Sequence, residues 1–293
     1  MPEFLEAWKS DDPEMRRIPS KTSTRSMMSK SVSKLSHFAA RTGESREEWW
    51  TYEFAHVVAK IVWMLFFLAT SLLVFLLVTW PYVGAFVITF FVMFIAQLAY
   101  FAKVTGYSDV VLGGRTVPIV RYIDWITTTP LMLFELCMIG GAETWQIGVD
   151  FQAFKEKHTT ILVIGCDLIM HATGIVSAMV VPKEKVKVKY AWFTMSVFCF
   201  TLMLLVLHRD VSWGTVNLRP SDVQALFDRL EWLTIISWSW YPIVVLLGRA
   251  HFGIISKGTE DALLCILDCI AKLGMEGFVV LSCTAPDAQC HAK

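Results

Sequence analysis

Long apolar runs dominate the chain from residue 53 onward and alternate with short polar connections. Each run is close to the roughly 20 residues that a helix needs to cross about 30 Å of hydrocarbon. Helices are the expected spanning form, because backbone groups in lipid must be satisfied within a segment and the runs lack the alternation of barrel strands. The runs that predict membrane helices are 53–78, 82–104, 119–141, 160–181, 190–207, 230–250 and 262–283. The pattern therefore predicts an all-α membrane protein, a bundle of seven transmembrane helices.

Two of the connections carry local structural signals. Gly113 and Gly114, flanked by β-branched residues, predict a short hairpin outside the membrane between the second and third helices. Pro220, Ser221 and Gln224 are typical of a helix N-terminus with a capping box, so the sixth helix is expected to begin before its apolar run.

The two ends of the chain are polar. Residues 1–51 are predicted to form a disordered polar and basic tail, because they lack a sustained apolar stripe and are rich in Ser, Lys and Arg from Arg16 onward. An organelle-targeting element is the alternative, against which the acidic start of the tail counts. The expected organisation is thus this tail, a seven-helix domain over 52–284 and a short C-terminal tail over 285–293.

Composition strengthens the membrane assignment and narrows the function. The 293 residues are 55% hydrophobic, with a mean hydropathy of +0.52, which is too apolar for an ordinary soluble domain. Lys plus Arg and Asp plus Glu are both 26, so no basic excess points to nucleic acid, and nucleic-acid binding is excluded. The seven cysteines are scattered and fall mostly within apolar runs, which predicts small buried side chains and neither a disulfide framework nor a metal site.

The third apolar run contains ionisable residues on one helical face. Arg121, Asp124, Thr128 and Glu135 follow a spacing of three, four and seven. Asp124 and Glu135 are about three turns apart, or roughly 16 Å, so one carboxylate is expected towards each side of the membrane. Asp124 alone could form a structural hydrogen bond between helices. A second carboxylate on the same face favours a proton route, since charges inside a spanning helix are costly and mark functional sites.

The seventh run carries a second set of charges. Glu260, Asp268, Lys272 and Glu276 recur at multiples of four and are predicted to share one face. A buried Asp268–Lys272 pair that only fixes packing explains little, because such pairs often stabilise no more than apolar residues. A desolvated lysine is a good nucleophile towards a carbonyl group, with which it forms a Schiff base. We therefore expect a long apolar aldehyde on Lys272, flanked by aromatic side chains such as Trp125.

Three motifs carry a resemblance that covers residues from about 53 to 283. They are RYIDWITTTP at 121–130, WSWYP at 238–242 and LDCIAK at 267–272. With these motifs in this order, the chain closely resembles the microbial (type 1) rhodopsins, and among them the light-driven proton pumps of the bacteriorhodopsin, fungal and algal kind. The resemblance implies a seven-helix bundle with all-trans retinal in its core.

The resemblance also implies a role for each charged position. Lys272 would bind retinal as a protonated Schiff base, with Asp124 as primary counterion and proton acceptor and Asp268 as second counterion. Arg121 would be a switchable cation beneath them, and Thr128 would hydrogen-bond Asp124. The remaining positions implied for proton transfer are Glu135 as cytoplasmic donor, Thr89 as its hydroxyl partner, Asp167 as a buried acid on the fourth helix and Glu260 as a release carboxylate. Glu276 has two readings, an additional proton carrier or a side chain that snorkels towards water.

The residues expected at the retinal pocket lie on several helices. They are Trp125, Thr129, Met170, Trp192, Ser196, Trp238, Tyr241, Pro242 and Ala271, with Tyr100 and Tyr122 nearby.

The function that the resemblance implies is outward proton transport driven by light, in an ion transporter and not an enzyme. A light-gated cation channel of the cryptophyte kind and a sensory photoreceptor are the alternatives. The expected partners are the lipid bilayer, protons and further copies of the chain in a homo-oligomer. The expected location is the plasma membrane or an organelle membrane of a eukaryotic microbe, as an integral multi-pass protein.

Overall fold

The computed structural model of the chain describes residues 46–79, 84–112, 115–140, 151–180, 186–209, 211, 216 and 221–284. The predicted C-terminal tail, and the predicted N-terminal tail up to residue 45, lie outside these residues. The chain divides into Met1–Trp49 and Trp50–Lys293, and the second unit contains the bundle.

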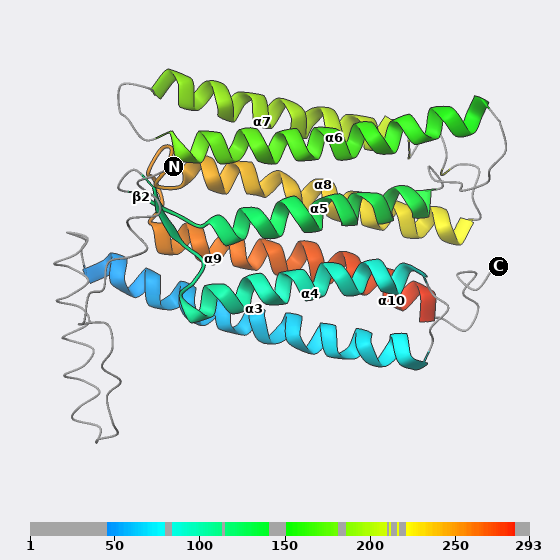
Figure 1. Cartoon of the computed structure of the whole chain (residues 1–293), viewed down its shortest axis with the longest axis horizontal. Coiled ribbons are helices and arrows are strands. Elements are labelled where there is room, and N and C mark those ends of the chain that lie inside the picture. Colours follow the sequence, from blue (N-terminus) through cyan, green and yellow to red (C-terminus); the bar gives the residue numbers. More distant parts are fainter. Residues whose placement is uncertain are drawn as a thin grey trace, which may run out of the picture. The chain divides into compact units, whose positions relative to one another are not determined.

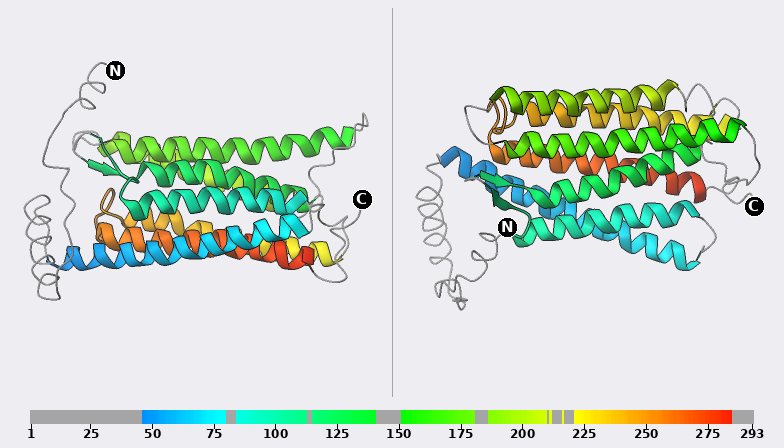
Figure 2. Two further views of the ribbon diagram at one scale, coloured as in Figure 1. Left: turned by 60° about the horizontal axis from the view of Figure 1, so that its bottom comes forward. Right: turned by 45° about the horizontal axis from the view of Figure 1, so that its top comes forward.

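Long helices run side by side through the second unit (Figures 1 and 2). Within the described residues, six helices are long and apolar enough to cross a membrane. Each overlaps one of the predicted runs, which confirms those six predictions. The six helices are α3 (Arg46–Thr79), α4 (Gly84–Thr105), α5 (Ile119–Gly140), α6 (Phe151–Met179), α7 (Val186–Val206) and α8 (Ser221–Leu247).

The seventh predicted run is also helical, but a π-helical turn divides it. It consists of α9 (Lys257–Asp268), the π turn η5 (Cys269–Leu273) and α10 (Gly274–Thr284). Ser256 caps the start of α9, where its hydroxyl accepts a hydrogen bond from the backbone N–H of Thr259 at 3.1 Å. Since π turns are rare and often occur at functional sites, the position of Lys272 inside η5 is informative.

The predicted hairpin and the early start of the sixth helix are confirmed, whereas Pro220 of the predicted capping sequence lies outside the described residues. Strands β1 (Val110–Leu112) and β2 (Arg115–Val117) pair antiparallel, with Val110 opposite Val117. The glycines between them lie outside the described residues. Helix α8 begins at Ser221, well before its apolar run.

Polarity in the bundle is the reverse of that in a water-soluble protein. Large apolar side chains on the outside are exposed, for example Leu68 at 60% and Phe75 at 62%. Ionisable side chains such as Asp124, Asp268 and Lys272 are buried. Apolar surface outside and charge inside are expected of a bundle whose solvent is lipid, so the chain is an integral, multi-pass membrane protein.

Candidate functional site

Lys272 and Asp124 form an ion pair in the interior of the bundle. The Nζ atom of Lys272 donates to Oδ2 of Asp124 at 2.6 Å, and the two side chains are only 3% and 1% exposed. The other carboxylate oxygen of Asp124, Oδ1, has no hydrogen-bond partner among the described residues. The acid that Lys272 contacts is thus Asp124 of α5, the residue expected as its primary counterion, and not Asp268, one turn away on its own helix.

Asp268 is held by aromatic side chains from three other helices. Its Oδ2 accepts from the hydroxyl of Tyr100 at 2.7 Å, and its Oδ1 accepts from Nε1 of Trp125 at 2.9 Å and from the hydroxyl of Tyr241 at 2.7 Å. Three donors that point at one carboxyl group require acceptor oxygens, which a carboxylate supplies. Asp268 is therefore held in place by three donors beside the Lys272–Asp124 pair.

Arg121 is paired with an acid that the sequence reading did not single out. Its Nη1 donates to Oδ1 of Asp261 at 3.0 Å, and Nζ of Lys103 lies 3.6 Å from Oδ2 of the same carboxylate. The Arg121 guanidinium also lies 5.9 Å from the ring centre of Trp125. A small cavity of about 20 Å³ lies between Arg121, Asp124 and Asp268, and this volume is enough for a single water molecule.

Glu260 lies near this end of the seventh helix but outside the Arg121 cluster. Its Oε2 accepts from the backbone N–H of Arg249 at 3.3 Å. Asp261 and not Glu260 therefore meets Arg121. The sequence did contain a sign of this role for Asp261. It lies seven residues before Asp268, and residues seven apart lie on one helical face.

The threonines of α5 only partly follow the expectation. The hydroxyl of Thr128 donates to the backbone carbonyl of Asp124 at 2.7 Å, so the expected bond to the Asp124 carboxylate is replaced by one to its main chain. Thr129 lies 2.8 Å from both Oδ2 of Asp167 and the carbonyl of Trp125, and it has one proton to donate between them. The Thr129–Asp167 contact connects α5 to α6 beside the cavity described next.

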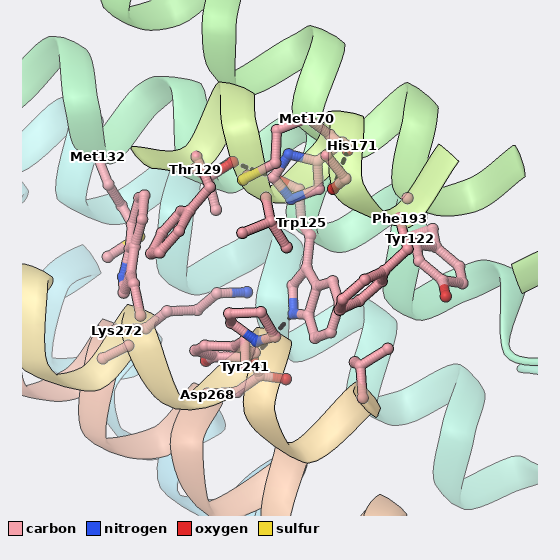
Figure 3. A pocket seen from close by; sticks show the side chains of 18 of the residues that line it. Tyr122, Trp125, Thr129, Met132, Met170, His171, Phe193, Tyr241, Asp268 and Lys272 are labelled. Carbon is pink, nitrogen blue, oxygen red and sulfur yellow. Dashed lines mark hydrogen bonds between the residues drawn. The ribbon is translucent and has the colours of Figure 1, made fainter. Parts of the chain in front are cut away.

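An apolar cavity of about 120 Å³ adjoins Lys272. Since one water molecule needs about 10–15 Å³ on this measure, the space suits a ligand of many atoms. Figure 3 shows the Lys272 side chain extending into it, with Trp125 and Tyr241 close to Asp268. The expected pocket residues that line it are Tyr122, Trp125, Thr129, Met170, Ser196, Trp238, Tyr241, Pro242 and Ala271.

Two expected pocket residues lie elsewhere. Trp192 is 40% exposed on the outside of α7 and does not line the cavity, so that prediction is wrong. Its neighbour Phe193 lines the cavity instead, because one residue rotates a helix position by about 100°. Tyr100 does not reach the cavity and contacts Asp268. Lining residues that the sequence reading missed are Met132 and Phe200, which carry no signal beyond lying in apolar runs, and His171, whose ionisable ring inside a spanning run was an available signal.

A third group of buried acids lies in the other half of the bundle. The hydroxyl of Thr89 donates to Oε1 of Glu135 at 3.1 Å, and Glu135 is 1% exposed. Glu276 of α10 is 2% exposed and interacts with both Glu135 and Thr89. Burial contradicts the snorkelling reading of Glu276, because a snorkelling carboxylate would reach the surface.

A buried lysine amine beside a cavity lined mainly by aromatic and aliphatic side chains fits an apolar aldehyde, to which the amine could bind covalently. Residues 51–285 match the family model described as "Bacteriorhodopsin-like protein". The chain therefore belongs to the microbial (type 1) rhodopsins. Members of this family bind retinal through a Schiff-base lysine, and they are light-driven ion pumps or sensors rather than enzymes.

Individual relatives agree with this assignment. The chain is 33% identical over 201 residues to bacteriorhodopsin of Haloterrigena sp. (strain arg-4), covering 67% of this chain and 73% of that protein. It is 31% identical over 191 residues to sensory rhodopsin-2 of Natronomonas pharaonis, covering 65% and 72%. The thermophilic rhodopsin of Rubrobacter xylanophilus is similar in structure, with a TM-score of 0.69, 30% identity and coverage of 78% of this chain and 95% of that one.

Proposed function

We propose that this protein is a light-driven outward proton pump that carries all-trans retinal on Lys272. One observation supports the proposal most strongly. The Lys272 nitrogen lies 2.6 Å from one buried acid, Asp124, while a separate set of buried acids around Glu135 lies further along α5. A proton on that nitrogen thus has an acceptor on one side and a source on the other.

The cavity fits retinal in chemistry and in place. Its wall is aromatic and aliphatic, its volume exceeds that of a few water molecules, and the Lys272 amine extends into it. When bound, retinal would supply a light-driven change of shape that moves the Lys272 nitrogen relative to the surrounding carboxylates. The protein must then hold, accept and replace the proton on that nitrogen.

The two carboxylates beside Lys272 suit different tasks. Asp268 already accepts three hydrogen bonds, so a proton added to it would have to displace a donor. Asp124 accepts one bond from Lys272, and its Oδ1 has no partner among the described residues. Asp124 is accordingly the proton acceptor, and Asp268 is the fixed counter-charge that keeps the nitrogen protonated in the dark.

The exit side of the proposed path begins at Arg121. The small cavity beside this residue could place one water between Asp124 and the Arg121–Asp261 pair. When Asp124 takes up a proton it becomes neutral and attracts the Arg121 cation less strongly. A resulting shift of Arg121 towards Asp261 would couple proton transfer inside the bundle to release at its surface. Glu260, next to Asp261, remains the candidate release group.

The entry side is separated from Lys272 by apolar packing. Met132 on α5, Trp238 on α8 and Met275 on α10 belong to the buried apolar cluster of the bundle, and Met275 lies between Lys272 and Glu276 along the chain. Such a dry layer would prevent a proton on Glu135 from reaching Lys272 until the protein rearranges. One-way transport requires this separation, because otherwise the nitrogen could be reprotonated from either side.

The deciding experiment is illumination of unbuffered cells that express the protein with all-trans retinal. Light should acidify the medium, and a protonophore should abolish the acidification. Voltage clamp separates the alternatives, because a pump current keeps its direction whereas a cation-channel current reverses near an equilibrium potential. Light responses without transport would instead favour a sensor. The outward direction, the homo-oligomer and the plasma or organelle membrane of a eukaryotic microbe are parts of this proposal that derive from the family resemblance.

A further inference from the structure

Glu276 brings a second buried carboxyl group to the proposed proton donor. Both of its oxygens, and Oε2 of Glu135, lack hydrogen-bond partners of ordinary geometry among the described residues. The two carboxyl groups nevertheless interact with each other, and Thr89 lies within range of both. Three unpaired buried oxygens at one place are unusual, because buried polar atoms nearly always have partners.

Neither acid has a cation to neutralise it. Glu135 and Glu276 form no ion pair among the described residues, and the cation whose charge reaches Glu276 is Lys272, which is bound to Asp124. Two carboxylates in contact inside a protein cannot both be ionised without a large cost. Two protonated carboxyl groups would turn two of the three unpaired oxygens into hydroxyl groups, which can donate where a carboxylate can only accept.

We propose that Glu135 and Glu276 form a single proton-donating unit, in which both acids are protonated at rest and share the remaining proton after one has been given up. The transfer step rests on the proposed pump function. In that step the O–H bond of Glu135 breaks and an N–H bond forms at Lys272. The hydroxyl of Glu276 then donates a hydrogen bond to the new Glu135 carboxylate, and a proton from the entry side later restores the O–H group.

Glu276 makes Glu135 a better donor because it stabilises the donor's charged product. A hydrogen bond to a carboxylate is about twice as strong as one between neutral groups. Thr89 contributes as well, but it has a single hydroxyl proton and donates it to Oε1 of Glu135. The partner available for the other oxygen of Glu135 is Glu276. Glu276 acts through Glu135 and is a positioning residue.

The test compares Glu276→Gln, Glu135→Gln and the double variant by infrared spectroscopy of the retinal-bound protein kept in the dark. Glu276→Gln should remove one protonated-carboxyl band and shift the band of Glu135, and Glu135→Gln should do the reverse. Asp228→Asn is the matched control, because it removes an exposed carboxylate from α8, and it should leave both bands in place. Loss of a carboxylate band in Glu276→Gln, or an unshifted Glu135 band, would overturn the proposal.

Kinetics after a light flash supply a second readout. Glu276→Leu, which cannot donate a hydrogen bond, should slow reprotonation of the Lys272 nitrogen by roughly 10–100-fold, as expected for one hydrogen bond to a charged group. The double variant should be no slower than Glu135→Gln alone, because residues that act as a unit are not additive. If the slowing in the double variant equalled the product of the slowing in the two single variants, the two acids would be independent proton carriers, which would contradict the shared unit.

The dark spectra also separate this inference from the pump proposal. Band coupling in a protein that does not acidify the medium would support the acid pair and contradict the pump. Normal acidification with uncoupled bands would contradict the acid pair alone. An intact visible absorption band in each variant confirms that the protein has folded around retinal.

Discussion

The two halves of the bundle solve the problem of buried charge in opposite ways. Around Lys272, each acid meets a cation or several donors, as Asp124 and Asp268 do. Around Glu135, the acids meet each other and one threonine, with no ion pair among the described residues. The first arrangement keeps charges separated and fixed, whereas the second favours neutral acids that can give up a proton.

This difference shows that carboxyl groups of the same kind can be given different tasks by their partners alone. Asp268 has all its donors in place and suits a permanent charge. Among the described residues, Glu135 has one oxygen without a hydrogen-bond partner and no paired cation, which favours a protonated carboxyl group. Each of the following variants removes one charged or hydrogen-bonding group from one of the two halves.

The largest effect is expected from Lys272→Ala, which removes the cation of the ion-paired half. Without its amine, retinal has no covalent attachment, so the visible absorption band should be absent from the purified protein. Lys103→Ala is the matched control, since Lys103 is a cation in the same half that lies outside the cavity, and it should keep the band. A visible band in Lys272→Ala would remove the assignment of this lysine.

Glu135→Gln should slow reprotonation of the Lys272 nitrogen by about 100-fold or more, because a general acid is replaced by a group that cannot give up a proton. Flash photolysis measures this rate directly. The control is Glu231→Gln, which changes a buried acid bound to His208 elsewhere in the bundle. Equal slowing in both variants would mean that buried charge in general, and not the donor position, sets the rate.

Asp261→Asn should leave Arg121 without its charged partner. The expected cost is about 1.5–3 kcal/mol, the range for a hydrogen bond to a charged group, measured as faster thermal loss of the visible band. Asp109→Asn breaks the more exposed pair with Lys257, where both side chains are 32% exposed, and should cost about 1 kcal/mol or less. The Arg121 pair would be judged incidental if the two variants lost stability equally.

The smallest effect is expected from Thr89→Val, which removes a single hydroxyl donor from Glu135. A net loss of about 1 kcal/mol should change the reprotonation rate by roughly 2–10-fold. Thr70→Val is the control for the substitution itself, because Thr70 is also buried and, among the described residues, donates to the carbonyl of Phe66 in its own helix. A Thr89→Val rate equal to that of wild type would show that Glu135 does not depend on this donor.

Helix positions could be predicted from sequence because apolar runs in a membrane protein have one dominant cause, the thickness of the hydrocarbon. The ends of the runs were less predictable. Helix α8 begins at Ser221, and the predicted run began only at residue 230, since the first turns are polar but still helical. Capping residues located this start better than hydropathy did.

The site was predictable where a motif fixed it and less so where helix rotation decided it. Trp192 and Phe193 are both aromatic residues in one apolar run, and only the helix phase separates the lipid-facing side chain from the cavity-lining one. Helix phase also decides between the neighbours Glu260 and Asp261 at the start of α9, where Asp261 forms the ion pair with Arg121. A period of four drifts by about 40° per step from a regular helix, so the predicted single face from Glu260 to Glu276 could not hold over its whole length.

The π turn η5 also determines which face of the seventh helix the residues after it occupy. A π turn accommodates one residue more than an α-helix of the same rise, so residues beyond Leu273 are rotated relative to a continuous α-helix. Had the same residues formed a continuous α-helix, α10 would be turned by about 100°, and Glu276 would lie away from Glu135 without a change of any side chain. Whether two acids meet in this protein is thus decided by a count of residues as much as by their chemistry.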